Sequence, residues 1–342
     1  MISPKVFIIA HSADEEQIWH GRKDFDIGAR KIAVPGLSNQ HPDVFCTADG
    51  EVCQVTTTMG LVNAALTVSA ILSYPDFDLT KTYFLIAGLA GINPATGTLG
   101  SVTIPRYVIQ VDLQYELDAR EIPTGWSTGY FPQGAMNPTE PPQIFYGTEV
   151  FELNQTLRDV AVAYAGKATL QESAVVAKHC QLYGNAVAKS SPSILTADVA
   201  ASNVFFHGSM LSKTIENTFS LFTNNRAIYG LTAQEDSATL AALLRGALQK
   251  KVVYSRIIVL RAASNFDQPP PAEPVEIPIH SGHGGFDLSK ENLWLVGSEI
   301  LKGIRKGWEE KFAEGAKADN YVGDIYGSLG GKPEFRQSVF LR

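Results

Sequence analysis

The sequence of 342 residues predicts an α/β fold in which helices cover both faces of a central mixed, mostly parallel sheet. Short apolar runs alternate with longer segments of helical periodicity, an order typical of strands joined by crossover helices. The apolar runs are continuous rather than alternating, which indicates strands buried on both faces. Because no internal repeat or long linker interrupts this order, we expect one domain over residues 1–342, with loop excursions near 121–142 and 267–285.

The predicted strands are short apolar runs bounded by turn residues. They lie at 5–10, 51–58, 82–87, 227–231 and 255–262, and the segment 101–112 is either a strand pair or one bent strand. The predicted helices have apolar residues at helical spacing. They lie at 61–73, 173–189, 235–250 and 288–317. The excursion at 121–142 contains several Gly and Pro residues together with Trp126 and Tyr130, which favours a lid that closes over a ligand.

The composition limits the classes of partner. Hydrophobic residues make up 45% of the chain, charged residues 18%, and the formal net charge is −7. A nucleic-acid surface needs clustered Lys and Arg, so we expect no nucleic-acid partner. No run of about eighteen apolar residues is present, so we expect no membrane span. No charged leader precedes the first apolar run, which favours a soluble cytoplasmic protein, or a secreted one if a leader has been removed.

The three cysteines give little support to a metal site. Cys46 and Cys53 flank a predicted hairpin turn, and they are compatible with a disulfide or with two reduced buried thiols. Cys180 is left over. Because the sequence contains no CxxC pair and no His-rich cluster, we expect neither a metal ion nor a cofactor.

Four strand ends carry polar or glycine-rich sequence, and ligands of parallel sheets bind beyond the carboxyl ends of strands. The segments are 11–16, 87–94, 230–237 and 260–267. The carboxylates of the first segment fit either the first turn of a helix or a general base that activates water. Those of the third fit either the first turn of a helix or a group that binds sugar hydroxyls. The glycines of the second permit close approach to a ligand. The Ser, Asn and Asp of the fourth fit either a turn or contacts to a purine.

These segments, in this order, resemble the purine nucleoside permease family, which is related to the nucleoside phosphorylase and methylthioadenosine nucleosidase superfamily. The resemblance runs from about Lys5 to Trp308, and its most specific motifs are at 59–65, 88–94, 234–236 and 261–267. It implies the three-layer nucleoside phosphorylase-like fold. Because no membrane span is expected, the word permease is set aside. The superfamily implies an enzyme that cleaves the glycosidic bond of a purine nucleoside, its small-molecule partner.

The resemblance also implies roles for single residues. Glu235 matches the carboxylate that binds the ribose diol, and Gln234 replaces the methionine that precedes it in the superfamily. Asn265 stands where nucleosidases place an Asp that protonates the purine at N7. An Asn can donate a hydrogen bond but no proton, so Asp267 is an alternative acid. Phe205 or Phe206 matches the aromatic that packs against the nucleoside.

The remaining positions implied to bind substrate are glycines and their neighbours near the sugar and anion. They are Gly60, Gly88, Leu89, Ala90 and Asp236. Superfamily members usually assemble, so a homo-oligomer is also expected.

The sequence favours hydrolysis over phosphorolysis. Ile86 and Leu89 stand where hexameric phosphorylases place an Arg and a Ser that bind phosphate. Glu15 falls where methylthioadenosine nucleosidases place their water-activating Glu, and a carboxylate repels phosphate. We therefore expect a purine nucleosidase in which Glu15 activates water. The alternatives are a phosphate-dependent purine nucleoside phosphorylase and a nucleoside-binding protein without catalysis.

Overall fold

The computed structural model describes residues 1–275 and 282–335, and its centre is a mixed sheet of 13 strands. The path runs β15–β10–β7–β12–β13–β5–β1–β4–β3–β2, while β14 pairs with β5 and β6, and β6 also pairs with β11. Its strands are β1 (Val6–Ala10), β2 (Arg30–Ala33), β3 (Asp43–Cys46), β4 (Val52–Thr56), β5 (Tyr83–Ile92), β6 (Val102–Thr103), β7 (Tyr107–Gln110), β10 (Val150–Glu152), β11 (Ile194–Leu195), β12 (Asp198–Ala201), β13 (Tyr229–Ala233), β14 (Ile257–Phe266) and β15 (Gly323–Asp324).

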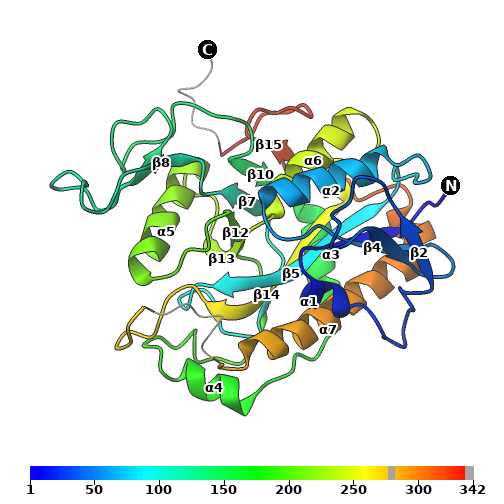
Figure 1. Cartoon of the computed structure of the whole chain (residues 1–342), viewed down its shortest axis with the longest axis horizontal. Helices are drawn as coiled ribbons and strands as arrows, with labels where there is room; N and C mark the ends of the chain where they lie inside the picture. The colour runs from blue at the N-terminus through cyan, green and yellow to red at the C-terminus, as the bar shows by residue number, and fades with distance from the viewer. Residues whose placement is uncertain (276–281, 336–342) are drawn as a thin grey trace.

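Seven α-helices are assigned within the described ranges, and they lie on both faces of the sheet (Figure 1). They are α1 (Ala13–Gln17), α2 (Leu61–Ser73), α3 (Gln155–Ala165), α4 (Ala174–Cys180), α5 (Ser209–Thr223), α6 (Asp236–Leu248) and α7 (Gly285–Lys306). Helices α2 and α6 cover one face and α3 and α7 the opposite one. The predicted fold class is confirmed.

Two apolar cores explain these layers. Phe7 and Ile9 of β1 pack with residues of α2 and α6, whereas Val6 and Ile8 point to the other face and pack with α3 and α7. Because successive residues of a strand point to opposite faces, a continuous apolar run serves both cores. The parallel pairs β1–β5 and β14–β5 therefore place the carboxyl end of β1 beside Ile86 in the middle of β5, and the carboxyl ends of β5 and β14 beside each other.

Several predicted boundaries were wrong. Strands β5 and β14 continue to Ile92 and Phe266, several residues beyond the predicted ends. The helix expected over 173–189 ends at Cys180, and the one expected over 288–317 starts earlier and ends at Lys306. The two strands run on because they pair with each other along nearly their whole length, a tertiary contact that no local pattern contains. Helix α2 has the predicted bounds.

The hairpin that connects β3 and β4 settles the alternative left open for the cysteines. Cys46 and Cys53 face each other across the antiparallel pair and form a disulfide. Cys180 is a buried free thiol.

The first excursion lies away from the sheet end that carries the polar segments. Residues 121–142 belong to a loop region around the two-stranded sheet of β8 (Gln114–Glu116) and β9 (Tyr130–Pro132). This region packs on α5, where Asn217 donates a hydrogen bond to the Pro138 carbonyl at 2.9 Å, and it forms the projection at the left of Figure 1. Of the second excursion, 267–285, residues 276–281 lie outside the described residues.

Candidate functional site

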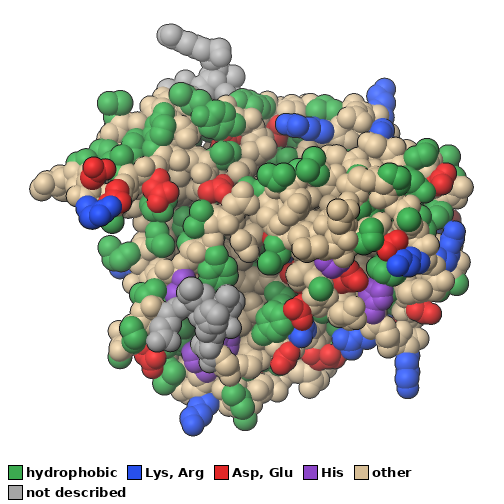
Figure 2. Space-filling view, in the orientation of Figure 1, with side chains coloured by type: hydrophobic (Ala, Val, Ile, Leu, Met, Phe, Trp, Pro, Cys, Tyr) green, Lys and Arg blue, Asp and Glu red, His purple; other side chains and the backbone are tan. Residues whose placement is uncertain are grey.

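A cavity of about 550 Å³ lies at the sheet end predicted for ligand binding. Its inner end is made by strand termini, with Glu15 after β1, Leu89–Gly91 of β5, Glu235 after β13, and Asn265 of β14. Its outer wall is made by Val204–Phe206 and by residues 282–287, which include Phe286. The volume suits a small organic molecule. Lys and Arg side chains are scattered over this face rather than gathered in a patch (Figure 2).

Glu15 lies at the inner end and is folded back over two strand ends. Ser12 caps helix α1 by accepting from the Glu15 N–H, which turns this residue toward the sheet. One carboxylate oxygen accepts from the His11 N–H at 2.7 Å and the other from the Leu89 N–H at 2.6 Å. The side chain is buried, and this burial raises its pKa above the ordinary value although Arg261 and both N–H groups oppose the change. Glu15 is therefore a buried carboxylate with more proton affinity than a surface Glu.

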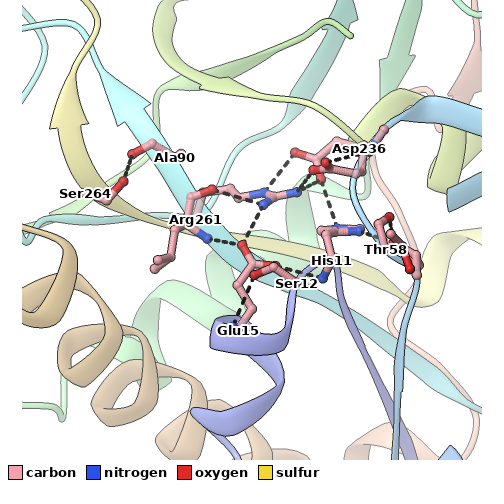
Figure 3. Close-up of polar contacts among 12 residues, drawn as sticks. His11, Ser12, Glu15, Thr58, Ala90, Asp236, Arg261 and Ser264 are labelled. Atoms are coloured by element: carbon pink, nitrogen blue, oxygen red, sulfur yellow. Dashed lines mark hydrogen bonds and ion pairs between the residues drawn. The ribbon is translucent and has the colours of Figure 1, made fainter. Parts of the chain in front are cut away.

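Arg261 lies in the 261–267 motif, and the sequence predicted no role for it. It is 1% exposed, and its guanidinium donates two hydrogen bonds to Asp236. It also lies 3.7 Å from a Glu15 oxygen (Figure 3). A Glu235 oxygen lies 3.9 Å from the same guanidinium. The sequence signal that could have revealed its role is a lone Arg inside an apolar strand, because a buried cation requires buried anions near it. One cation is thus surrounded by three carboxylates.

Glu235 is held at the inner end by the backbone of the segment before α2. The Gly60 N–H donates to a Glu235 oxygen at 3.0 Å. Burial raises the pKa of Glu235 to about 7, against the opposing influences of Arg261 and this N–H. Glu235 and Glu15 both line the cavity and share the same cation, so the inner end concentrates negative charge.

Asn265 reaches the cavity through an irregularity in β14. Ala263 pairs with Ala90 and Asn265 with Gly91, so Ser264 is an extra residue, a β-bulge that re-aims the following side chain. The Ser264 hydroxyl lies 3.0 Å from the Asn265 amide oxygen, and the amide nitrogen donates to the Phe266 carbonyl at 3.1 Å. A side-chain amide carries two N–H donors, so Asn265 can offer the other one to a ligand.

Asp267, the alternative acid, lies behind the cavity wall rather than on it. Its Oδ2 accepts from the Tyr229 hydroxyl at 2.6 Å and from the Ser212 hydroxyl at 2.8 Å. Burial raises its pKa to about 6. These contacts fix the end of β14 against α5 and β13, so of the two candidates only Asn265 faces the cavity.

Three residues predicted to touch substrate also lie behind the lining. Gly60 acts through its N–H on Glu235, and Asp236 binds Arg261. At Gly88 a Cβ atom would come within 2.3 Å of a Glu15 oxygen and 2.4 Å of an Arg261 nitrogen. The glycine is therefore needed for the contact between these two side chains rather than for a ligand. The predicted residues that do line the cavity are Glu15, Leu89, Ala90, Phe205, Phe206, Gln234, Glu235 and Asn265.

The outer wall differs from the expectation for a lid. No residue of 121–142, a segment that the structure describes in full, lines the cavity, whereas His283, Phe286 and Asp287, which the sequence did not single out, do. His283 stacks on His179 with ring centroids 4.6 Å apart, which fixes the start of this segment. Phe205 and Phe206 face the cavity from the segment between β12 and α5.

The sequence model of the purine nucleoside permease family matches residues 3–317. The chain belongs to this family. It is 40% identical to a purine nucleoside permease of Candida albicans, over 98% of this chain and 84% of that protein. It is 32% identical to a probable purine nucleoside permease of Schizosaccharomyces pombe, over 90% of this chain and 91% of that protein.

Solved structures show the relation of the fold. A 5′-methylthioadenosine/S-adenosylhomocysteine nucleosidase of Neisseria meningitidis aligns with a TM-score of 0.51 at 15% identity, covering 88% of this chain and 99% of that one. A futalosine hydrolase of Helicobacter pylori aligns with a TM-score of 0.50 at 15% identity, covering 89% and 97%. The predicted nucleoside phosphorylase-like fold is thus confirmed, and the association with purine nucleosides is supported by the family.

Two kinds of feature are absent from the described residues. In the ranges 1–275 and 282–335, no helix is long and apolar enough to cross a membrane. In the same ranges, no group of three or more His, Cys, Asp and Glu side chains is arranged to hold a metal ion.

Proposed function

We propose that the protein is a hydrolase that cleaves the N-glycosidic bond of purine nucleosides into free base and ribose. The observation that carries this proposal is the charge of the inner end. Glu15 and Glu235 line the cavity, whereas no Lys or Arg is among its described lining residues. The nearby cation, Arg261, is buried and bound by Asp236. Phosphate as a reactant needs a cation that faces the cavity, so water is the nucleophile that this charge distribution favours.

In the proposed mechanism, each step is performed by one of the polar side chains that line the cavity. Glu235 accepts hydrogen bonds from the ribose diol and holds the sugar. Glu15 takes a proton from a water molecule as the water oxygen bonds to C1′. The bond from C1′ to the purine nitrogen breaks, and its electron pair goes to the purine, where the Asn265 N–H stabilises charge at N7. The purine leaves with a proton from solvent or from Glu15.

The electrostatics favour the transition state of this reaction. Positive charge develops on the ribosyl ring as the glycosidic bond breaks. Three carboxylates around one guanidinium leave excess negative charge beside the ring. Preorganised charge of opposite sign stabilises a transition state more than the neutral ground state.

The same charges define the substrate class. A 5′-phosphorylated nucleoside would bring a dianion to a cavity lined by Glu15, Glu235 and Asp287. We therefore assign unphosphorylated purine nucleosides as substrates. A purine nucleotide should be cleaved at least about tenfold more slowly at equal concentration, because one unfavourable charge contact costs more than about 1.4 kcal/mol in a buried site.

The homo-oligomer stays a prediction. Met59, Val62, Leu66, Val204 and Phe205 are exposed apolar side chains near the cavity or on α2, where a second copy of the chain would cover them.

The test is an assay of the purified protein with inosine and adenosine, with and without phosphate. We expect free base and ribose at the same rate in both conditions. Strict dependence on phosphate, with ribose 1-phosphate as product, would show a phosphorylase. Binding of nucleoside in calorimetry without release of base would show a non-catalytic binding protein.

A further inference from the structure

The turn between β4 and α2 holds a β-branched residue in a strained conformation. Thr58 has a φ of 68°, in the left-handed region that β-branched residues rarely adopt. Such residues persist only where surrounding contacts hold them, and they cluster at functional sites. The strained residue lies two positions before Gly60, the donor to Glu235.

The contacts of Thr58 identify what holds it. Its hydroxyl donates to the Ser38 hydroxyl oxygen at 2.8 Å. Its carbonyl accepts from the Thr57 hydroxyl at 2.8 Å, and Thr57 is bonded to His11 at 2.9 Å. The contacts of the Thr57 hydroxyl fix Thr57, the residue that precedes Thr58. The hydrogen bond to Ser38 is the contact made by the Thr58 side chain itself.

Ser38 lies on the segment 34–42 between β2 and β3, outside the cavity lining. Its oxygen also accepts from the Gln40 N–H at 3.3 Å, which fixes the hydroxyl within its own loop. The loop is tied a second time near the site, because His41 lies 2.9 Å from a Glu16 oxygen that also accepts from the Thr56 hydroxyl at 2.6 Å. Ser38 is thus a fixed point against which Thr58 is held.

We propose that Ser38 is a positioning residue for the sugar-binding carboxylate: it holds Thr58 in the left-handed conformation and so keeps the Gly60 N–H on Glu235. Without this contact Thr58 relaxes toward negative φ, and the N–H two residues later turns away. This inference rests on the proposed function, in which Glu235 binds the sugar. No feature of the 234–236 motif reveals it, because Ser38 lies in a separate loop far away in the sequence.

The ionisation of Glu235 reports on this contact. The charged groups that face it are Arg261 of β14, Glu15 of α1 and Asp236 of α6, and none of them changes when Ser38 is replaced. The Gly60 N–H lowers the pKa of Glu235, so its loss raises that pKa further. The consequence is a weaker sugar contact and an acidic limb of the kcat/KM profile that moves to higher pH.

The experiment uses the full chain as Ser38→Ala, Thr58→Gly and the double variant, with Ser38→Thr as the control that keeps the hydroxyl. We expect Ser38→Ala to raise KM for inosine roughly threefold to tenfold, as one lost hydrogen bond implies, and to move the acidic limb upward. Ser38→Thr keeps both values near those of the wild type. In the Thr58→Gly background, Ser38→Ala should have less effect, because glycine adopts positive φ without cost.

A second measurement does not depend on turnover. The Glu235 carboxyl is titrated by NMR in protein labelled with 13C-glutamate, with Glu235→Gln used to assign its signal. A raised pKa of Glu235 in Ser38→Ala supports the role of Ser38 even if the wild type releases no base. Absence of base release would contradict only the proposed function. An unchanged pKa overturns the role of Ser38, and so does a shift of equal size in the wild-type and the Thr58→Gly backgrounds.

Discussion

The inner end and the outer wall of the cavity are built from different parts of the fold. Glu15, Glu235 and Asn265 stand at the ends of strands that pair in the centre of the sheet, and each is fixed by backbone hydrogen bonds. The outer wall consists of connecting segments, 204–206 and 282–287, whose lining side chains are the apolar Val204, Phe205, Phe206 and Phe286 together with His283 and Asp287. We infer that the inner end performs chemistry common to many nucleosides, while the outer wall selects among them.

The largest expected effect is at Glu15. Replacement of a general base costs about 10² to 10⁴ in rate, so Glu15→Gln should lower kcat for inosine by about 10³ with little change in KM. Because burial raises the pKa of Glu15, the wild-type rate should increase with pH through the acidic range. Base release followed by absorbance measures both. Asp14→Asn is the control, since the Asp14 side chain is 61% exposed and lines no part of the cavity. An equal loss in both variants would contradict the assignment.

Glu235→Gln should lower kcat/KM by about 10-fold to 100-fold, because a charged acceptor is replaced by a neutral one. The same change should stabilise the fold at pH 8. The pKa of Glu235 is raised to about 7 in the folded state, so its contribution to stability is present below about pH 4.5 and is lost as pH rises toward 7. That loss is roughly 3 kcal/mol.

Thermal unfolding at pH 5 and pH 8 tests the stability part of this prediction. The melting temperature of Glu235→Gln should exceed that of the wild type at pH 8 and approach it at pH 5. The reverse order would show that Glu235 is stabilised as a carboxylate by Arg261.

Asn265→Ala should lower the rate with inosine by about tenfold, the value of one hydrogen bond that strengthens in the transition state. With 4-nitrophenyl riboside, whose leaving group needs no stabilisation at N7, the rate should stay near that of the wild type. A matched loss on both substrates would assign Asn265 to the sugar rather than to the base.

The smallest effect is expected at the outer wall. Phe206→Leu removes an aromatic face but keeps an apolar side chain, so KM should rise about twofold to tenfold while kcat is unchanged. A fall in kcat as large as that of Asn265→Ala would remove the distinction between the two ends of the cavity.

The sequence predicted the parts of this molecule that depend on local patterns. The bounds of helix α2 and the strands β1 and β4 follow from periodicity and turn residues, because these act over a few positions. The short buried strands β10 and β12 were not predicted. The order of the motifs predicted the fold and placed Glu15, Glu235 and Asn265 at strand ends. It also predicted the hairpin of Cys46 and Cys53, although not their bond.

The tertiary structure alone decided how these groups act on one another. Arg261 faces Gly88 across the β5–β14 pair, and only that register brings its charge to Glu15 and Asp236. The bulge at Ser264 turned Asn265 to the cavity, and distant contacts held Asp267 behind it. The physical reason is distance. Electrostatic and hydrogen-bond energies depend on a few ångströms between residues far apart in the chain, and spacing along the sequence does not contain those distances.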